Sequence, residues 1–308
     1  MSGQAKVHRI AMGSAVAAVF VGLAWADATG LAGAGPAWWL LPVAIVVGIG
    51  GVHELVRLCA AGDLLLPAWL LRPAVVAVPL AAACGAQAFS AATALAAPTA
   101  AVGWAAAAFM AGVFALFAAE VAAYRPHGRA AERLAAATFI LAYLGLPLAF
   151  MVSLRLVCVE NLGAEQRGPG HIGIVPLLSL VAVVKAGDVA AYAVGSLVGR
   201  TRLAPVLSPG KTWEGAAASV AGALAAAWLV LERSGLDAAG RPWGGWVVYG
   251  LAVGLAGMLG DLGESLLKRE AGTKDSGTSL GGLGGVLDLV DSLLFAAPVA
   301  WLLWAVGR

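Results

Sequence analysis

The chain has 308 residues, of which 61% are hydrophobic and 12% are charged, against ~25% charged residues in typical soluble domains. A formal net charge of +2 is too small to indicate nucleic-acid binding, and the three cysteines show no CxxC spacing that would indicate redox chemistry. A mean hydropathy of +0.89 favours a chain that is solvated largely by lipid. The composition therefore predicts an all-α polytopic integral membrane protein.

Nine stretches come close to the ~20 mostly apolar residues that a membrane-spanning helix needs. They are approximately 10–26, 37–56, 66–89, 100–120, 134–154, 172–195, 215–232, 244–263 and 285–305. The connections between them are too short for a separate soluble domain. We expect an N-terminal transmembrane bundle over residues 1–170 and a C-terminal catalytic transmembrane region with cytoplasmic loops over residues 171–308.

The N-terminus is expected on the cytoplasmic side of the membrane. With that orientation, twelve Lys and Arg residues lie in cytoplasmic segments and five on the opposite side, as the positive-inside rule requires. The first span has an alternative explanation, because Ala24-Trp25-Ala26 has the form of a signal-peptide cleavage site. Its apolar stretch is longer than such signals usually are, so a retained helix is favoured and cleavage stays open.

Asp188 lies within an expected span, where a charge costs at least ~2.5–3.5 kcal/mol on insertion scales. Lys185 precedes it by three residues on the same helix face, so an internal ion pair is one explanation. The other explanation is that Asp188 lines a polar cavity open to the cytoplasm.

A second polar segment, Ser208-Pro209-Gly210-Lys211-Thr212-Trp213-Glu214, leads into the seventh expected span. A loop with Lys, Ser, Thr and free backbone N–H groups before a helix start is suited to binding phosphate. The alternative is an ordinary helix start that is capped by Thr212.

The end of the eighth expected span carries Asp261, Glu264, Ser265 and Lys268. Their spacing of i, i+3, i+4 and i+7 places them on one helix face. Further cations follow at Arg269 and Lys274, and Asp275 opens a glycine-rich turn in which backbone can approach a ligand closely.

Asp288 and Asp291 stand three apart in the first turn of the last expected span, with Cβ atoms ~5–6 Å apart. Two like charges at a membrane boundary repel one another unless a cation lies between them, and oxygen ligands suit Mg²⁺. The alternative is that these acids complement the positive N-terminal end of the helix dipole.

His53 and Glu54 lie near the end of the second expected span. They lack the second His of a HExxH zinc motif. A capping or interfacial role is therefore expected for this pair.

Several of these motifs resemble the phosphatidate cytidylyltransferase (CDP-diacylglycerol synthase) family. The C-terminal signature is Ser265-x-x-Lys268-Arg269-x4-Lys274-Asp275-x-Gly277, followed by Gly284-Gly285-x-x-Asp288-x-x-Asp291. Upstream, the similar motifs are Asp188-x-x-Ala191-Tyr192-x-x-Gly195, Ser208-Pro209-x-Lys211-Thr212-x-Glu214-Gly215 and Gly260-Asp261-x-x-Glu264-Ser265. The likeness covers residues 188–292.

The resemblance implies a homodimeric enzyme of the cytoplasmic (inner) membrane whose active site faces the cytoplasm. It implies that CTP and phosphatidate are joined into CDP-diacylglycerol and pyrophosphate with Mg²⁺, and it allows a second, monovalent cation. Carried over by position, the metal ligands are Asp261, Asp275, Asp288 and Asp291. The catalytic residues are Asp261, Lys268, Arg269, Lys274, Asp275 and Asp288. The substrate-binding residues are Asp188, Tyr192, Ser208, Pro209, Lys211, Thr212, Glu214 and Ser265.

Two positions depart from the family pattern, because Leu283 and Leu289 stand where the family commonly has His and Arg. Neither leucine can carry a proton or hold a phosphate. Two related activities stay open, a CTP-dependent lipid kinase and a cytidylyltransferase for another lipid phosphate. A third alternative is a transporter or scaffold without catalysis, although a transporter would more naturally place its polar residues near the membrane midplane.

Overall fold

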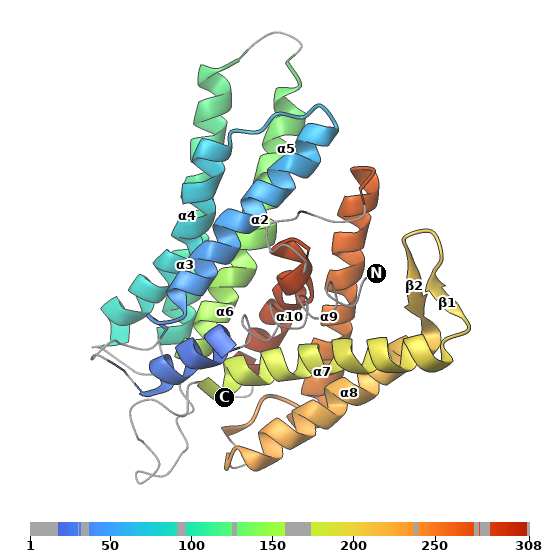
Figure 1. The fold of residues 1–308 in the computed structure, drawn as a ribbon. Coiled ribbons are helices and arrows are strands. Elements are labelled where there is room, and N and C mark those ends of the chain that lie inside the picture. The colour runs from blue at the N-terminus through green and yellow to red at the C-terminus, as the bar shows by residue number, and fades with distance from the viewer. Residues whose placement is uncertain are drawn as a thin grey trace.

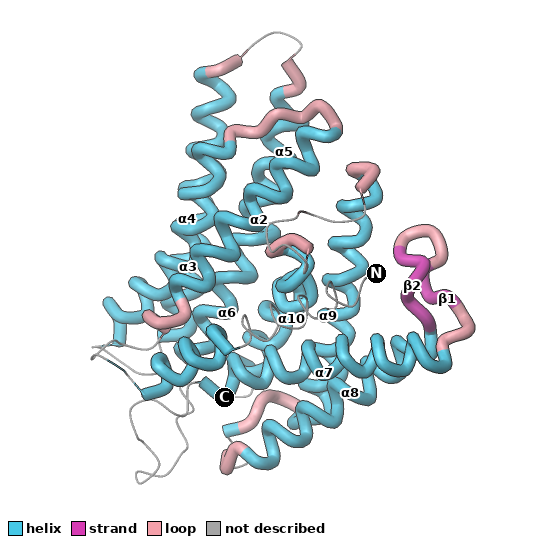
Figure 2. Tube along the Cα trace, in the orientation of Figure 1, coloured by secondary structure: helices cyan, strands magenta, loops and turns pink. Residues whose placement is uncertain are grey.

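The computed structural model describes residues 18–29, 31, 37–90, 97–124, 128–157, 174–236, 240–273, 277 and 284–306. Within these ranges the chain is almost entirely helical (Figures 1 and 2). The helices are α2 (Leu41–Ala61), α3 (Ala68–Ser90), α4 (Ala97–Ala122), α5 (Ala130–Ile140), the π-helix η3 (Leu141–Gly145), α6 (Leu146–Leu156), α7 (Ile174–Val198), α8 (Trp213–Arg233), α9 (Gly245–Glu270) and α10 (Leu287–Val306).

Eight of the nine expected spans are confirmed as helices long and apolar enough to cross a membrane, and α5, η3 and α6 together form one of them. The first expected span, 10–26, is described only from residue 18 onward, as the shorter apolar helix Ala18–Thr29. The protein is thus a multi-pass all-α membrane protein, as the composition predicts.

The short helix Ala18–Thr29 is tied to α6 by a buried ion pair. The Asp27 carboxylate pairs with the Arg155 guanidinium, and both side chains are buried. Asp27 also accepts a hydrogen bond from the Trp39 backbone N–H at 3.2 Å. Because both charges are paired and hydrogen-bonded, this contact is tolerated within an apolar bundle.

Small residues allow α7, α8 and α9 to pack at close range. A Cβ added at Gly222 of α8 would lie 2.8 Å from Ala190 Cβ of α7, and one at Gly254 of α9 would lie 2.7 Å from Ala223 Cβ of α8. Such small residues let the helix backbones approach closely. Close packing matters in lipid, because no hydrophobic driving force brings the helices together there. In Figure 1, α7 and α8 run side by side, and a small two-stranded sheet lies between the end of α7 and the start of α8 in the chain.

Two apolar cores form on either side of α10. The first is built mainly from α2 to α6, and the second from α7 to α9 with the short N-terminal helix. Leu287 and Val290 of α10 belong to the first core, whereas Leu293 and Ala297 belong to the second. The last helix therefore packs against both groups of spans.

The two-stranded sheet is a feature that the sequence did not predict. Strands β1 (Arg202–Ala204) and β2 (Ser208–Thr212) pair antiparallel, with Arg202 opposite Thr212 and Ala204 opposite Ser208. The Trp213 backbone N–H donates to the Thr201 carbonyl at 2.9 Å, which closes the base of the hairpin. The segment that was expected to be a loop is thus a hairpin that leads directly into α8.

Candidate active site

A polar cavity of about 600 Å³ lies where α7, α8, α9 and α10 meet the hairpin. Seven of the residues that the sequence singled out for the site line it, although they come from elements far apart in the chain. They are Asp188, Tyr192, Lys211, Thr212, Asp261, Asp288 and Asp291. Its charged and hydroxyl-bearing lining comprises Lys185, Asp188, Tyr192, Ser196, Arg202, Lys211, Thr212, Ser219, Asp261, Asp288, Asp291 and Ser292.

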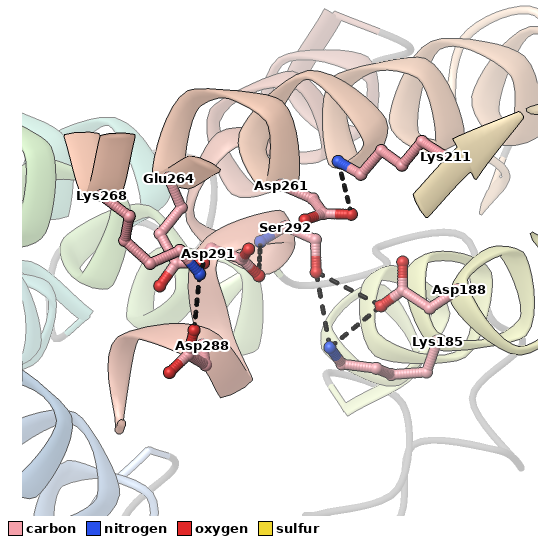
Figure 3. A network of polar contacts seen from close by, with 9 residues as sticks. All are labelled: Lys185, Asp188, Lys211, Asp261, Glu264, Lys268, Asp288, Asp291 and Ser292. Atoms are coloured by element: carbon pink, nitrogen blue, oxygen red, sulfur yellow. Dashed lines mark hydrogen bonds and ion pairs between the residues drawn. The ribbon is translucent and has the colours of Figure 1, made fainter. Parts of the chain in front are cut away.

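On the α7 wall of the cavity, Lys185 and Asp188 form an ion pair with Nζ 3.1 Å from Oδ2 (Figure 3). The Lys185 ammonium also donates to the Leu289 carbonyl of α10 at 3.1 Å and to Ser292 Oγ at 3.4 Å. The internal ion pair expected for Asp188 is therefore confirmed, and Asp188 also lines a polar cavity.

Lys211 of β2 and Asp261 of α9 face each other across the cavity, with Nζ 2.7 Å from Oδ2 (Figure 3). Arg202 of the neighbouring strand lines the same space. The hairpin thus presents two cations to the acids of the helices.

A third pair lies at the N-terminal end of α10. The Lys268 ammonium is 2.7 Å from Asp288 Oδ1 and 2.7 Å from Glu264 Oε2. Glu264 is almost fully buried on α9, so the i,i+4 contact with Lys268 supplies a compensating charge. Asp288 Oδ2 accepts from the Gly285 backbone N–H at 2.7 Å, which fixes its carboxylate in the first turn.

Asp291 is arranged differently from the other acids of the cavity. Its side chain is only 5% exposed, and its Oδ1 accepts from the Ser292 backbone N–H at 2.6 Å. Within the described ranges, no basic side chain forms an ion pair with it. Asp291 is thus a buried carboxyl group at the cavity wall that has no ion-pair partner among the described residues.

The acids of the cavity can supply part of the coordination shell of Mg²⁺, but not all of it. No three carboxylate, imidazole or thiol groups of the described residues gather into a ready-made metal site. Mg²⁺ commonly takes only one or two carboxylates from a protein and completes its shell with waters and substrate phosphates. Asp261, Asp288 and Asp291 line one cavity and can offer that number of ligands, whereas the expected fourth ligand, Asp275, lies outside the described residues.

The hairpin residues have mixed roles. Thr212 Oγ1 accepts from the Gly215 backbone N–H at 3.1 Å, so the capping alternative is confirmed, although Thr212 also lines the cavity. The Glu214 carboxylate accepts from the Thr201 N–H at 3.2 and 3.3 Å and stabilises the hairpin base. Ser208 and Pro209 lie in β2 but are not among the described residues that line the cavity.

The remaining predicted residues lie at the edge of the cavity, outside it, or outside the described residues. Tyr192 lines the outer wall and is 79% exposed. Arg269 is exposed and donates through Nε to the Leu207 carbonyl at 3.2 Å, so it holds the hairpin turn. Ser265 is half-buried on α9 and is not part of the described lining. Lys274 lies outside the described residues, as does Leu283.

Sequence reasoning missed cavity functions for Lys185, Arg202 and Ser292. The sequence indicated Lys185 as a possible partner for Asp188 and did not indicate Arg202 or Ser292. The signal that points to Lys185 is the rarity of a basic side chain inside an apolar span. A capping or interfacial role was expected for His53 and Glu54, and capping is confirmed for Glu54, whose carboxylate accepts from the Val286 and Leu287 N–H groups at 2.8 and 2.9 Å.

The bundle and its charged cavity define a multi-pass membrane protein with a site suited to phosphate groups. The sequence profile of the Cytidylyltransferase family matches residues 7–306, and the chain belongs to this family. The motif resemblance is thereby confirmed.

Three relatives, each named phosphatidate cytidylyltransferase, show how far the similarity extends. The chain is 44% identical to the protein of Brucella suis over 140 residues, which is 46% of this chain and 50% of the relative. It is 41% identical to that of Haemophilus influenzae over 131 residues (42% and 45%) and 40% identical to that of Synechocystis over 133 residues (42% and 43%). The chain thus spans about half the length of the curated relatives it matches.

Proposed function

We propose that this protein transfers a cytidylyl group from CTP to phosphatidate, giving CDP-diacylglycerol and pyrophosphate. The observation that carries the proposal is the set of three acid–lysine pairs around one cavity: Asp188–Lys185, Asp261–Lys211 and Asp288–Lys268. Family membership and the names of the relatives supply the nucleotide and the lipid.

In the resting site, each of the three lysines is paired with a carboxylate. When a triphosphate enters, each lysine exchanges its carboxylate for a phosphate oxygen, and the released carboxylates become available as metal ligands. Mg²⁺, when bound, neutralises charge on the triphosphate and on the pyrophosphate leaving group. Asp291 supports this role because its buried carboxyl group has no basic partner among the described residues.

In the reaction, a phosphate oxygen of phosphatidate attacks the α-phosphorus of CTP, and the bond from that phosphorus to the bridging oxygen of pyrophosphate breaks. A phosphate monoester has its second pKa near ~6, so the lipid is already largely dianionic at neutral pH. No general base is needed, and the loss of the family His at Leu283 costs little. Catalysis then rests on positioning and on the cations that stabilise the leaving group.

Lys185 takes over the cationic role that the family commonly gives to an Arg at position 289. Its ammonium is 3.1 Å from the Leu289 carbonyl and lines the cavity. The charge is thus delivered from α7 instead of α10. Among the cations of the described cavity wall, Lys185 is the one bonded to residue 289.

We further infer that the active site and the N-terminus face the cytoplasm and that the protein resides in the inner membrane as a homodimer. The twelve-to-five division of basic residues supports the orientation, as does the location of CTP in the cytoplasm. The homodimer and a second, monovalent cation rest on the family resemblance alone.

The test is to incubate purified protein in mixed micelles with phosphatidate, Mg²⁺ and CTP labelled on either the α- or the γ-phosphorus. We expect α-label to enter the lipid and γ-label to leave as pyrophosphate. Transfer of γ-label to lipid would instead identify a CTP-dependent kinase, and a better substrate among other lipid phosphates would identify a different acceptor. Absence of any lipid product from folded protein would favour a transporter or scaffold.

A further inference from the structure

Glu54 connects the N-terminal half of the bundle to the candidate active site. It lies on α2, is fully buried, and binds the start of α10, 232 and 233 positions further along the chain. Each carboxylate oxygen accepts one backbone N–H, from Val286 at 2.8 Å and from Leu287 at 2.9 Å. A buried carboxylate is tolerated when it is hydrogen-bonded in this way at a helix N-terminus, where the dipole is positive.

Three backbone N–H groups at the start of α10 donate to carboxylates of the protein itself. Gly285 N–H donates to Asp288, while Val286 and Leu287 donate to Glu54. A helix N-terminus is otherwise a ready anion site, but this one has no free donor at these three positions. These three N–H groups are therefore not available to substrate phosphates, and the side-chain cations of the cavity are the expected phosphate ligands.

Glu54 also packs closely against the segment that precedes α10. A Cβ added at the buried Gly277 would lie 2.8 Å from Glu54 Oε1. Backbone and carboxylate are thus already in close contact at this point. Glu54 thus contacts both the start of α10 and the backbone at Gly277.

We propose that Glu54 is a positioning residue of the active site, which holds the first turn of α10 so that Asp288 and Asp291 point into the cavity. The two acids follow Leu287 by one and four residues, or ~1.5 and ~6 Å along the helix axis. A displaced first turn would move both. Useful ligand geometry tolerates only about 0.5 Å of error. The inference rests on the proposed function for its catalytic consequence, but not for the positioning itself.

The test compares Glu54→Gln with a matched control, Asp27→Asn. Gln keeps the size of the side chain but turns one acceptor into a donor that faces a backbone N–H. Asp27 is likewise a buried carboxylate that accepts a backbone N–H, yet it lies outside the cavity lining. Three quantities are measured in detergent: hydrogen exchange of the segment 284–294, Mg²⁺-dependent thermal stabilisation in the presence of CTP, and kcat.

For Glu54→Gln we expect amide exchange at the start of α10 to accelerate about tenfold or more, and half-saturation by Mg²⁺ to rise about tenfold, as when an outer-shell contact is lost. We expect kcat to fall about tenfold or more. Asp27→Asn should lower the melting temperature without changing these three quantities. Wild-type exchange and wild-type Mg²⁺ dependence in Glu54→Gln would overturn the proposal, as would equal changes in Asp27→Asn.

If Glu54→Gln does not fold, Gly277→Ala provides the second variant, because it keeps the carboxylate and displaces it. The same changes in exchange and Mg²⁺ dependence are expected, and their absence counts equally against the proposal. Exchange and thermal stabilisation do not require turnover. A wild-type protein without cytidylyl transfer would therefore refute the proposed function while leaving the positioning role of Glu54 measurable.

Discussion

Replacing Lys185 with Met tests whether α7 supplies a cation for the substrate phosphates. Met keeps most of the side-chain length and removes the ammonium, which now contacts Asp188, the Leu289 carbonyl and Ser292. The Asp188 side chain is 40% exposed, so water can solvate it after the substitution and the fold should survive. A hydrogen bond to a charged group contributes about 1.5–3 kcal/mol. At 1.36 kcal/mol per factor of ten, kcat/KM for CTP should fall roughly 10- to 150-fold.

The assay is the initial rate of lipid-linked cytidine formation at varied CTP and fixed phosphatidate. Lys185→Arg is the control and should retain most activity, because it keeps the charge. The ammonium bonds to the backbone carbonyl of Leu289, whereas the Leu289 side chain packs against the apolar core of α2 to α6. Near-normal kcat/KM in Lys185→Met would refute the role of Lys185.

Three further outcomes are expected. Asp288→Asn should fold and lose about a hundredfold or more in turnover while its Mg²⁺ dependence weakens; an active variant with unchanged Mg²⁺ dependence would leave the helix-dipole role as the explanation for Asp288. Removing divalent cations with EDTA should abolish transfer, and Mg²⁺ should restore it; full activity in EDTA would exclude the metal role. In a cysteine-free background, Glu270→Cys should be labelled from the cytoplasm and Arg233→Cys from the opposite side; labelling of both from one side would contradict the topology.

The helical spans were predictable because crossing a membrane demands a property that is local in the sequence. About 20 apolar residues suffice to identify a span, and α2 to α10 follow that rule.

The hairpin was not predictable in the same way. Ser208–Thr212 contains Pro and Gly, which are depleted in strands, and its partner strand is only three residues long. Its pairing depends on closure across Pro205–Leu207 and on the Trp213–Thr201 hydrogen bond.

The contacts of the site likewise divide into local contacts, which were predictable, and contacts between distant elements, which were not. Lys185–Asp188 and Glu264–Lys268 are i,i+3 and i,i+4 pairs, so helix periodicity alone brings them together. Lys211–Asp261 and Lys268–Asp288 join different elements. Their pairing depends on which helices are neighbours, and sequence spacing carries no information about that. Glu54 is the extreme case, because the sequence allowed a capping or interfacial role but carried no information about which helix it caps.

The separation between Glu54 and its partners has a consequence for biosynthesis. At ~5–20 residues per second, a ribosome needs roughly 10–50 s to make the 232 residues between Glu54 and Val286. During that interval the carboxylate is already part of a membrane segment but lacks the N–H groups that satisfy it in the finished protein. An unsatisfied acid inside a membrane is unfavourable, so insertion of α10 relieves a penalty that the earlier helices carry. The contact between Glu54 and the start of α10 thus favours insertion of this helix, and the same contact then orders Asp288 and Asp291.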